Sequence, residues 1–240
     1  CRISDWQAWS PYAHSKEHWR EWASQSSDMP VIEDKPALAW VNPMLRRRLS
    51  FLSRLMLHAA HQLQLEHEID AWVFASRHGE IHTTLQLLKD IANEQPLSPM
   101  NFSLSVHNSG AGLFSIADNV QAPMTAIAAG KDTLVMAMID AVAKLARLPE
   151  GKIAVVYVEE RLCEAYIEHQ DGDADALALG LVLGPEGIPL TVRREEDNNK
   201  PMVEVSAAES LIKLLLSANG EASANLPAEL GYWHLMKGQD

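Results

Sequence analysis

The stretch 98–130 holds residues whose types and spacing could do chemistry. Ser109 lies two positions after His107 in the segment HNSGAG, and Ser105 lies two positions before it. A serine beside a histidine suggests a nucleophile with its base, as in acyl transfer or hydrolysis. The segment lacks the GxSxG strand-to-helix elbow that presents such serines, so a helix-capping role is the favoured interpretation of Ser109. A stand-alone enzyme could use Ser109, Ser105 or Cys163.

Histidines are the second group with possible chemistry. His58, His61 and His67 lie near one another along one apolar segment, and His14 and His18 are four positions apart. Such spacing could present metal ligands on one helix face, but no HExxH motif and no cysteine pair accompanies them. We therefore interpret them as solvated or partly buried side chains. The sequence predicts no metal site and no cofactor.

Composition excludes several classes of function. The chain has 240 residues, 47% of them hydrophobic, and its 20 basic and 32 acidic residues give a formal net charge of −12. That charge repels nucleic acid and anionic membrane surfaces. Cys1 and Cys163 cannot form a disulfide framework, which suits a reducing cytosol. No apolar run approaches the ~20 residues of a membrane span, so we expect a cytoplasmic protein that binds neither nucleic acid nor membrane.

Predicted strands alternate with predicted helices along the chain. Strands are expected over 1–12, 70–76, 123–128 (short and central), 152–160, 176–183 and 189–195, and the tail 231–236 could be an edge strand. Helices are expected over 15–23, from Asn42-Pro43 through Leu63, and over 80–93, 108–118, 131–147 and 206–218. This alternation indicates an α/β layered domain with a mixed sheet covered on both faces.

Three details of these elements can be checked directly. The helix over 80–93 is expected to point Ile81, Leu85, Leu88 and Ile91 inward, and a proline-punctuated loop is expected through Pro96 and Pro99. The segment 131–147 is apolar on nearly every side, which predicts a helix buried in the interior. The acidic runs 171–175 and 195–197 are expected to be solvated loops.

The frame TAIAAG, Thr125 to Gly130, carries a resemblance to a known family. It resembles the TAC-x-x-G segment of the β-ketoacyl synthases, in which a cysteine nucleophile ends a buried strand and opens an apolar helix. Here Ile127 stands in the position of that cysteine. Isoleucine has no lone pair and no ionisable proton, so it cannot attack a thioester. The resemblance therefore implies that the chain has no catalytic nucleophile.

The resemblance covers about residues 36–195. Its other pieces are Ser98-Pro99 with Phe102, Asn108, Gly110-Ala111-Gly112, Ser115-Ile116, Pro123 and Asp140-Ala141. The phrases LRRR, ASRHGE and SPMNFSLSVHN look more particularly like the chain length factors of aryl polyene and related type II polyketide systems. The implied fold is α/β and thiolase-like, namely the N-terminal half of a ketosynthase: a mixed sheet covered by helices, with a buried central helix. We expect one domain over 1–240, with its core at about 36–195 and an appended helix and tail at about 200–240.

Departures from the family indicate what the chain needs. A complete ketosynthase repeats this half, and its second half supplies two histidines; after Ile127 this chain has only His169 and His234, neither in such a setting. The half fold would leave a sheet face or edge uncovered, which a partner must cover. The resemblance thus implies a catalytically inactive subunit in a heterodimer with an active β-ketoacyl synthase.

The arginines Arg46–Arg48 could bind an acyl carrier protein or form a solvated helical turn. Because the net charge opposes an acidic carrier, carrier contact is expected to be indirect, through the partner.

By resemblance, residues 99–107 would project into the neighbouring subunit and close its acyl tunnel. The candidate gate residues are Met100, Phe102, Leu104, Val106 and Phe114. Each added methylene gains only ~0.8 kcal/mol of burial, whereas forcing a chain into filled space costs typically ~1–3 kcal/mol. Steric closure can therefore set the length of a polyene or polyketide chain. Two alternatives stay open: a stand-alone acyltransferase or hydrolase, and a structural stabiliser of a ketosynthase that does not touch the acyl chain.

Overall fold

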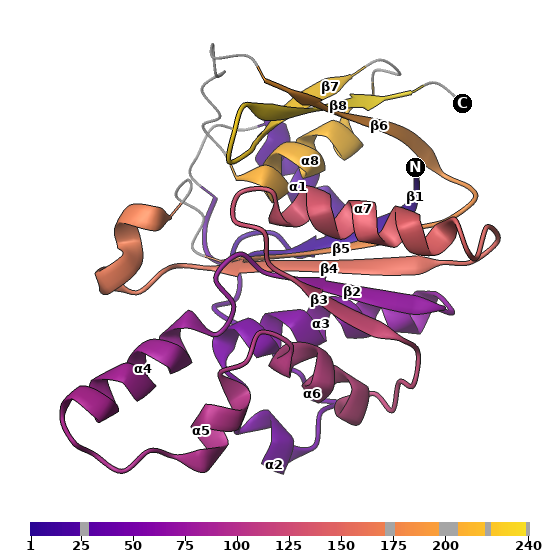
Figure 1. Cartoon of the computed structure of the whole chain (residues 1–240). Coiled ribbons are helices and arrows are strands. Elements are labelled where there is room, and N and C mark those ends of the chain that lie inside the picture. The colour runs from indigo at the N-terminus through magenta and orange to yellow at the C-terminus, as the bar shows by residue number, and fades with distance from the viewer. Residues whose placement is uncertain (25–28, 171–175, 197–205, 219–221, 239–240) are drawn as a thin grey trace.

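One mixed, eight-stranded sheet organises the protein (Figure 1). The structure is a computed structural model that describes residues 1–24, 29–170, 176–196, 206–218 and 222–238. The acidic run 171–175 and part of the run 195–197 lie outside the described residues. The strands are β1 (Arg2–Trp9), β2 (Ala71–Ala75), β3 (Met124–Ile127), β4 (Ile153–Glu160), β5 (Ala176–Leu183), β6 (Ile188–Glu195), β7 (Ser223–Pro227) and β8 (Tyr232–Lys237).

The strand order is β3-β2-β4-β5-β1-β6-β8-β7. β2 pairs in parallel with β3 and β4, and the remaining pairs are antiparallel. The appended C-terminal segment thus extends the same sheet through β8 and β7. The strand expected at the tail is β8, which lies inside the sheet between β6 and β7 rather than at its edge.

Helices cover both faces of the sheet, as predicted (Figure 1). On one face lie α2 (Pro43–Arg46), α3 (Phe51–Glu66), α4 (Ile81–Ala92), α5 (Pro99–Leu104) and α6 (Ser109–Ala117). On the other lie α1 (Lys16–Ser24), α7 (Thr133–Leu145) and α8 (Ala207–Leu216), and a 3₁₀ helix (Glu164–His169) follows β4. A separate apolar core fills each face. In the part of the chain that is described, no helix is long and apolar enough to cross a membrane.

The long helix predicted from Asn42 through Leu63 is wrong in its first part. The Asn42 side chain accepts a hydrogen bond from the Met44 N–H (2.9 Å), but the helix that it caps, α2, ends at Arg46. The Ser50 hydroxyl then accepts a bond from the Ser53 N–H (2.9 Å) and starts α3. Two capping residues in one apolar pattern therefore produce two helices.

The inner face predicted for the helix over 80–93 is wrong for Leu88 and Ile91, while Ile81 and Leu85 are half-buried. Leu87 is the buried residue of α4, whereas Leu88 and Ile91 are exposed. The loop expected at Pro99 is helical: the Ser98 hydroxyl accepts a bond from the Asn101 N–H (3.3 Å), and Pro99 takes the first helical position of α5. α4 and α5 thus leave apolar side chains in contact with solvent.

β3 and α7 are less enclosed than the sequence predicts. β3 pairs only with β2 among the described strands, so it is the sheet's edge and not a central strand. α7 buries Leu134 and Met138 against the sheet but exposes Ile139 and Val142. Among the described strands, the sheet therefore has β3 at one edge and β7 at the other, and the helix predicted to be central is buried along one side only.

Candidate functional site

The turn between β3 and α7 is where the family frame would place a nucleophile. β2, β3 and β4 are parallel, so their carboxyl ends meet at one edge of the sheet. Ile127 is the last residue of β3; it is half-buried in the core beside α7, and its carbonyl accepts a bond from the Ser76 N–H (3.3 Å). α7 begins only at Thr133, so Ile127 does not open the helix as the frame implied. A group at residue 127 therefore lacks the helix N-terminus that would activate it.

Gly130, with a φ of +55°, lies in the turn that leads into α7. A Cβ added there would lie 2.0 Å from Oε1 of Glu229, and the same carboxylate accepts a bond from the Lys131 N–H (2.8 Å). Trp233 of β8 donates its indole N–H to the Asp132 carboxylate (2.6 Å). The C-terminal hairpin thus holds this turn. Neither Ile127 nor Gly130 offers a nucleophilic atom.

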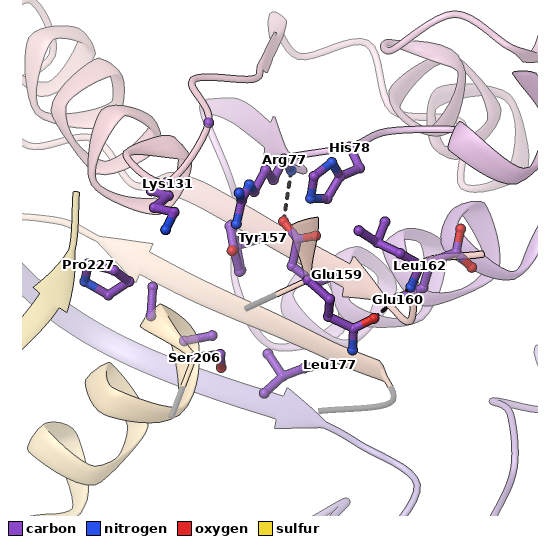
Figure 2. Close-up of a pocket in the computed structure, with 14 residues that line it drawn as sticks. Arg77, His78, Lys131, Tyr157, Glu159, Glu160, Leu162, Leu177, Ser206 and Pro227 are labelled. Carbon is purple, nitrogen blue, oxygen red and sulfur yellow. Dashed lines mark hydrogen bonds between the residues drawn. The ribbon is translucent and has the colours of Figure 1, made fainter. Parts of the chain in front are cut away.

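A small pocket lies beside this turn, at the ends of β2 and β4 (Figure 2). Arg77 and His78 enter it from the end of β2, and Lys131 enters from the turn. Glu159 enters from β4, and its carboxylate accepts a hydrogen bond from the Arg77 backbone N–H (2.7 Å). Pro227 and the first residues of α8 close the other side. The pocket volume is about 50 Å³, well below the roughly 300–1,000 Å³ of ordinary ligand sites. The single chain therefore has no room here for an acyl thioester.

Two buried carboxyl groups beside this pocket escaped the sequence analysis. Glu80 precedes α4, and its Oε1 accepts bonds from the Ser50 and Ser53 hydroxyls, both at 2.7 Å. Glu160 ends β4 with a side chain that is 8% exposed. Burial, and next the Glu80 and Glu159 carboxylates, raise the pKa of Glu160 to about 8. The sequence did hold one signal for Glu160: two adjacent glutamates, Glu159 and Glu160, end the otherwise buried strand β4.

The candidate nucleophiles of a stand-alone enzyme lie in three separate settings. Ser109 is buried, and its hydroxyl has no hydrogen-bond partner among the described residues. The His107 ring nitrogen Nε2 instead meets the Ser76 carbonyl at 2.9 Å. Ser105 donates its hydroxyl to the Phe102 carbonyl (2.8 Å), and Cys163 is half-buried at the start of the 3₁₀ helix. The structure therefore does not bring a serine–histidine pair together here.

The histidines noted in the sequence serve local packing. His61 stacks on Trp40 and meets the Asp118 carboxylate at 2.8 Å, and His67 meets the Asp5 carboxylate at 2.9 Å. Burial lowers the pKa of His58 to about 4, with smaller contributions from nearby histidines. Among the described residues, the carboxylates and histidines that could share a metal ion are Asp5, Glu66 and His67. Asp5 already pairs with Lys16 at 2.8 Å, which argues against a metal ion there. The absence of a metal site stays a prediction.

The gate candidates fall into two places. Met100, Phe102 and Val106 are exposed on and just after α5, and Leu104 is half-buried beside a cavity of about 140 Å³. Phe114 of α6 is completely buried. Its ring lies 4.9 Å from that of Trp72 and 5.7 Å from that of Phe74, measured between centroids. The α5 residues can reach a partner, whereas Phe114 belongs to the core of its own chain.

The chain is similar to known proteins in sequence and in fold. The family model described as "Beta-ketoacyl synthase, N-terminal domain" matches residues 19–234. The chain belongs to this family, and its fold is that of the thiolase-like N-terminal half of a ketosynthase. No curated protein sequence matched significantly.

Solved structures extend this result. A chain in the structure of a ketosynthase (ApeO) in complex with its chain length factor (ApeC) from Xenorhabdus doucetiae is similar over 98% of both chains, with 26% identity and a TM-score of 0.83. The ishigamide ketosynthase/chain length factor matches 82% of this chain and 68% of its own, at 19% identity and a TM-score of 0.60. The ketosynthase from module 6 of the bacillaene synthase of Bacillus subtilis 168 matches 83% of this chain and 42% of its own, at 12% identity and a TM-score of 0.54. The last two similarities establish the fold alone.

Proposed function

We propose that this protein is a non-catalytic chain length factor that pairs with an active β-ketoacyl synthase of an aryl polyene or related type II polyketide system. One observation carries the proposal: Ile127 and Gly130, the residues at the family's nucleophile turn, have no nucleophilic atom. The neighbouring pocket of about 50 Å³ is too small for an acyl thioester. A synthase activity must therefore reside in a second subunit.

The length of the matched chain supports the same function. The chain from the ApeO–ApeC structure is covered over 98% of its own length, so it is about as short as this protein. A complete ketosynthase contains two copies of the half fold, whereas this chain has one sheet of that type. A single-half chain found in a ketosynthase–chain length factor complex fits the chain length factor rather than the synthase. We infer the same role, and a cytoplasmic location, for the present protein.

Two surfaces are suited to a partner. No other described strand pairs with the outer edge of β3, so a partner strand could bond its backbone groups. On the helical layer that covers one face of the sheet, α5 and the residues after it expose Met100, Phe102 and Val106, with Phe102 64% exposed. In this proposal these side chains and Leu104 reach the partner's acyl tunnel and limit its length. Phe114 acts only indirectly, by supporting the helices behind them.

Carrier-protein contact is proposed to remain with the synthase subunit. Arg47 and Arg48 are exposed, while Arg46 donates to the Leu38 carbonyl (3.3 Å). An exposed helical turn of this kind fits the solvated interpretation, and the net charge of −12 opposes an acidic carrier. We propose no cofactor. The stand-alone acyltransferase or hydrolase gains no support, because no base among the described residues lies within hydrogen-bond distance of the Ser109 hydroxyl and the His107 Nε2 meets the Ser76 carbonyl instead.

Co-expression with a ketosynthase from the same gene set tests the proposal. We expect a one-to-one complex and a product whose length changes when Phe102 is replaced by Ala. Leu230→Ala is the matched control, because Leu230 is also exposed (73%) but lies on the turn between β7 and β8. An intact complex whose product length ignores Phe102→Ala and Met100→Ala would favour a structural stabiliser instead. Failure to form any complex would contradict the proposal itself.

A further inference from the structure

Two buried polar atoms that have no hydrogen-bond partner among the described residues belong to side chains of the same cavity. They are the indole N–H of Trp9, a residue of β1 that is 2% exposed, and Nε2 of His14, which lies between β1 and α1. The cavity has a volume of about 150 Å³ and lies between β1, β5 and the middle of α3. Buried polar groups are normally hydrogen-bonded, so these two atoms indicate that the cavity takes an occupant.

The two atoms offer one donor and one acceptor. An indole N–H can only donate. Burial lowers the pKa of the His14 ring, while the Glu33 carboxylate and a hydrogen bond with the Ser10 backbone act in the opposite direction. A backbone bond that favours the protonated ring is one that the ring donates to a carbonyl group. Because Nε2 has no partner, the ring donates through Nδ1, and Nε2 of the neutral ring is left as an acceptor.

Water alone suits this cavity poorly. One water occupies about 30 Å³ and needs about three polar partners when it is buried. The indole of Trp9 and the ring of His14 stack with centroids 5.4 Å apart and planes at 11°, and the His58 ring stands edge-on to the indole at 6.4 Å. Methyl groups add to the apolar lining, from Ala8, Ala59 and Ala178. Since an apolar cavity of about 150 Å³ can hold benzene, a six-membered ring fits this one.

The charges at the cavity favour an uncharged ligand. Of the described residues that line it, Glu33 alone carries a formal charge at neutral pH, since burial lowers the pKa of His58 to about 4. A carboxylate ligand would be repelled by Glu33 and could not donate to His14. An ammonium group could not accept from Trp9. An amide has a carbonyl that accepts and an N–H that donates, so it satisfies both atoms.

We propose that this cavity binds a small uncharged cyclic amide, with its carbonyl at the Trp9 indole N–H and its N–H at Nε2 of His14. A flat six-membered ring such as a pyridone has these two groups side by side. The site is independent of the proposed partner edge, because β2 and β4 separate β5 from β3 in the sheet. Binding can therefore be measured on the full chain without a partner.

The probe is 2-pyridone, and its binding is followed by NMR of the full chain with ¹⁵N-labelled indoles. The signal that Trp9→Phe removes identifies the Trp9 indole. We expect this signal to shift downfield and to saturate with a dissociation constant of about 1 mM or lower. N-methyl-2-pyridone, which lacks the N–H donor, should bind about 10-fold more weakly because Nε2 stays unpaired. His14→Phe keeps a ring in the wall but removes the acceptor, so it should weaken 2-pyridone binding by a similar factor.

Trp22→Phe is the matched control variant. Trp22 lies on α1 and does not line the cavity, so the affinity for 2-pyridone should be unchanged. Equal affinities of the wild type for 2-pyridone and N-methyl-2-pyridone would overturn the amide assignment. A Trp9 signal that does not respond to 2-pyridone up to about 20 mM would overturn the site and leave a cavity filled by water only. Both results come from the wild-type chain, so they do not depend on the folding of a variant.

Discussion

Truncation of Phe114 separates a core residue from a gate residue. The ring is fully buried and packs on Trp72 and Phe74, at centroid distances of 4.9 and 5.7 Å. Loss of a buried phenylalanine removes its transfer free energy and leaves a cavity, which together cost about 3–5 kcal/mol. We expect Phe114→Ala to lower the free energy of unfolding of the isolated chain by that amount.

The matched change is Phe102→Ala. Phe102 is 64% exposed, and surface substitutions usually change stability by less than about 0.5 kcal/mol. Urea denaturation followed by tryptophan fluorescence measures both variants, since Trp72 lies beside Phe114. In the complex the order should reverse, with Phe102→Ala weakening partner binding by about 1–2 kcal/mol as an interface residue. A Phe114→Ala chain that unfolds within about 1 kcal/mol of the wild type would refute the packing argument.

Three further predictions concern the isolated chain. Burial lowers the pKa of His58 from 6.5 to about 4. The histidine is therefore protonated at a higher pH in the unfolded state than in the folded state, and the free energy of unfolding should fall as the pH drops from about 6.5 to about 4. The loss is on the order of 3 kcal/mol, and His58→Gln should flatten the pH profile of urea unfolding; an unchanged profile would contradict the assignment. The Ser206 hydroxyl caps α8, and Glu209 completes the capping box, so Ser206→Ala should cost about 1 kcal/mol and lower the thermal midpoint. Ile127→Cys should not acquire an acyl group from a thioester in intact-mass measurements, because α7 begins too far from residue 127 to activate a thiol.

The fold was largely predictable because several of its strands are continuous apolar runs in the sequence. Runs such as AWVFA in β2 and ALALGLVL in β5 are completely buried. A strand buried on both faces can be recognised from its own apolar side chains, without knowledge of its neighbours. Helix orientation was less predictable. α4 carries leucines and isoleucines at helical spacing, yet Leu88 and Ile91 face solvent, since an apolar stripe that awaits a partner has the same pattern as one that faces the core.

The site was predictable only in part. The frame TAIAAG indicated that the nucleophile is missing. The turn at Gly130 and Lys131, however, is contacted by Glu229, which lies far along the chain. The burial of Glu160 beside Glu80 likewise joins residues that are distant in sequence. No local pattern records such contacts. For the same reason Phe114, chosen for its place in the family segment, could not be recognised as a core residue before the fold was known.

The location of the acyl group in the reconstituted pair tests the central claim most directly. The complex is incubated with an acyl thioester of the carrier protein, and the intact mass of each subunit is then measured. The account predicts that the mass of an acyl group is added to the ketosynthase subunit alone, while this chain keeps its original mass. An acyl adduct on this chain, on Ser109, Ser105, Cys163 or any other residue, would contradict the account.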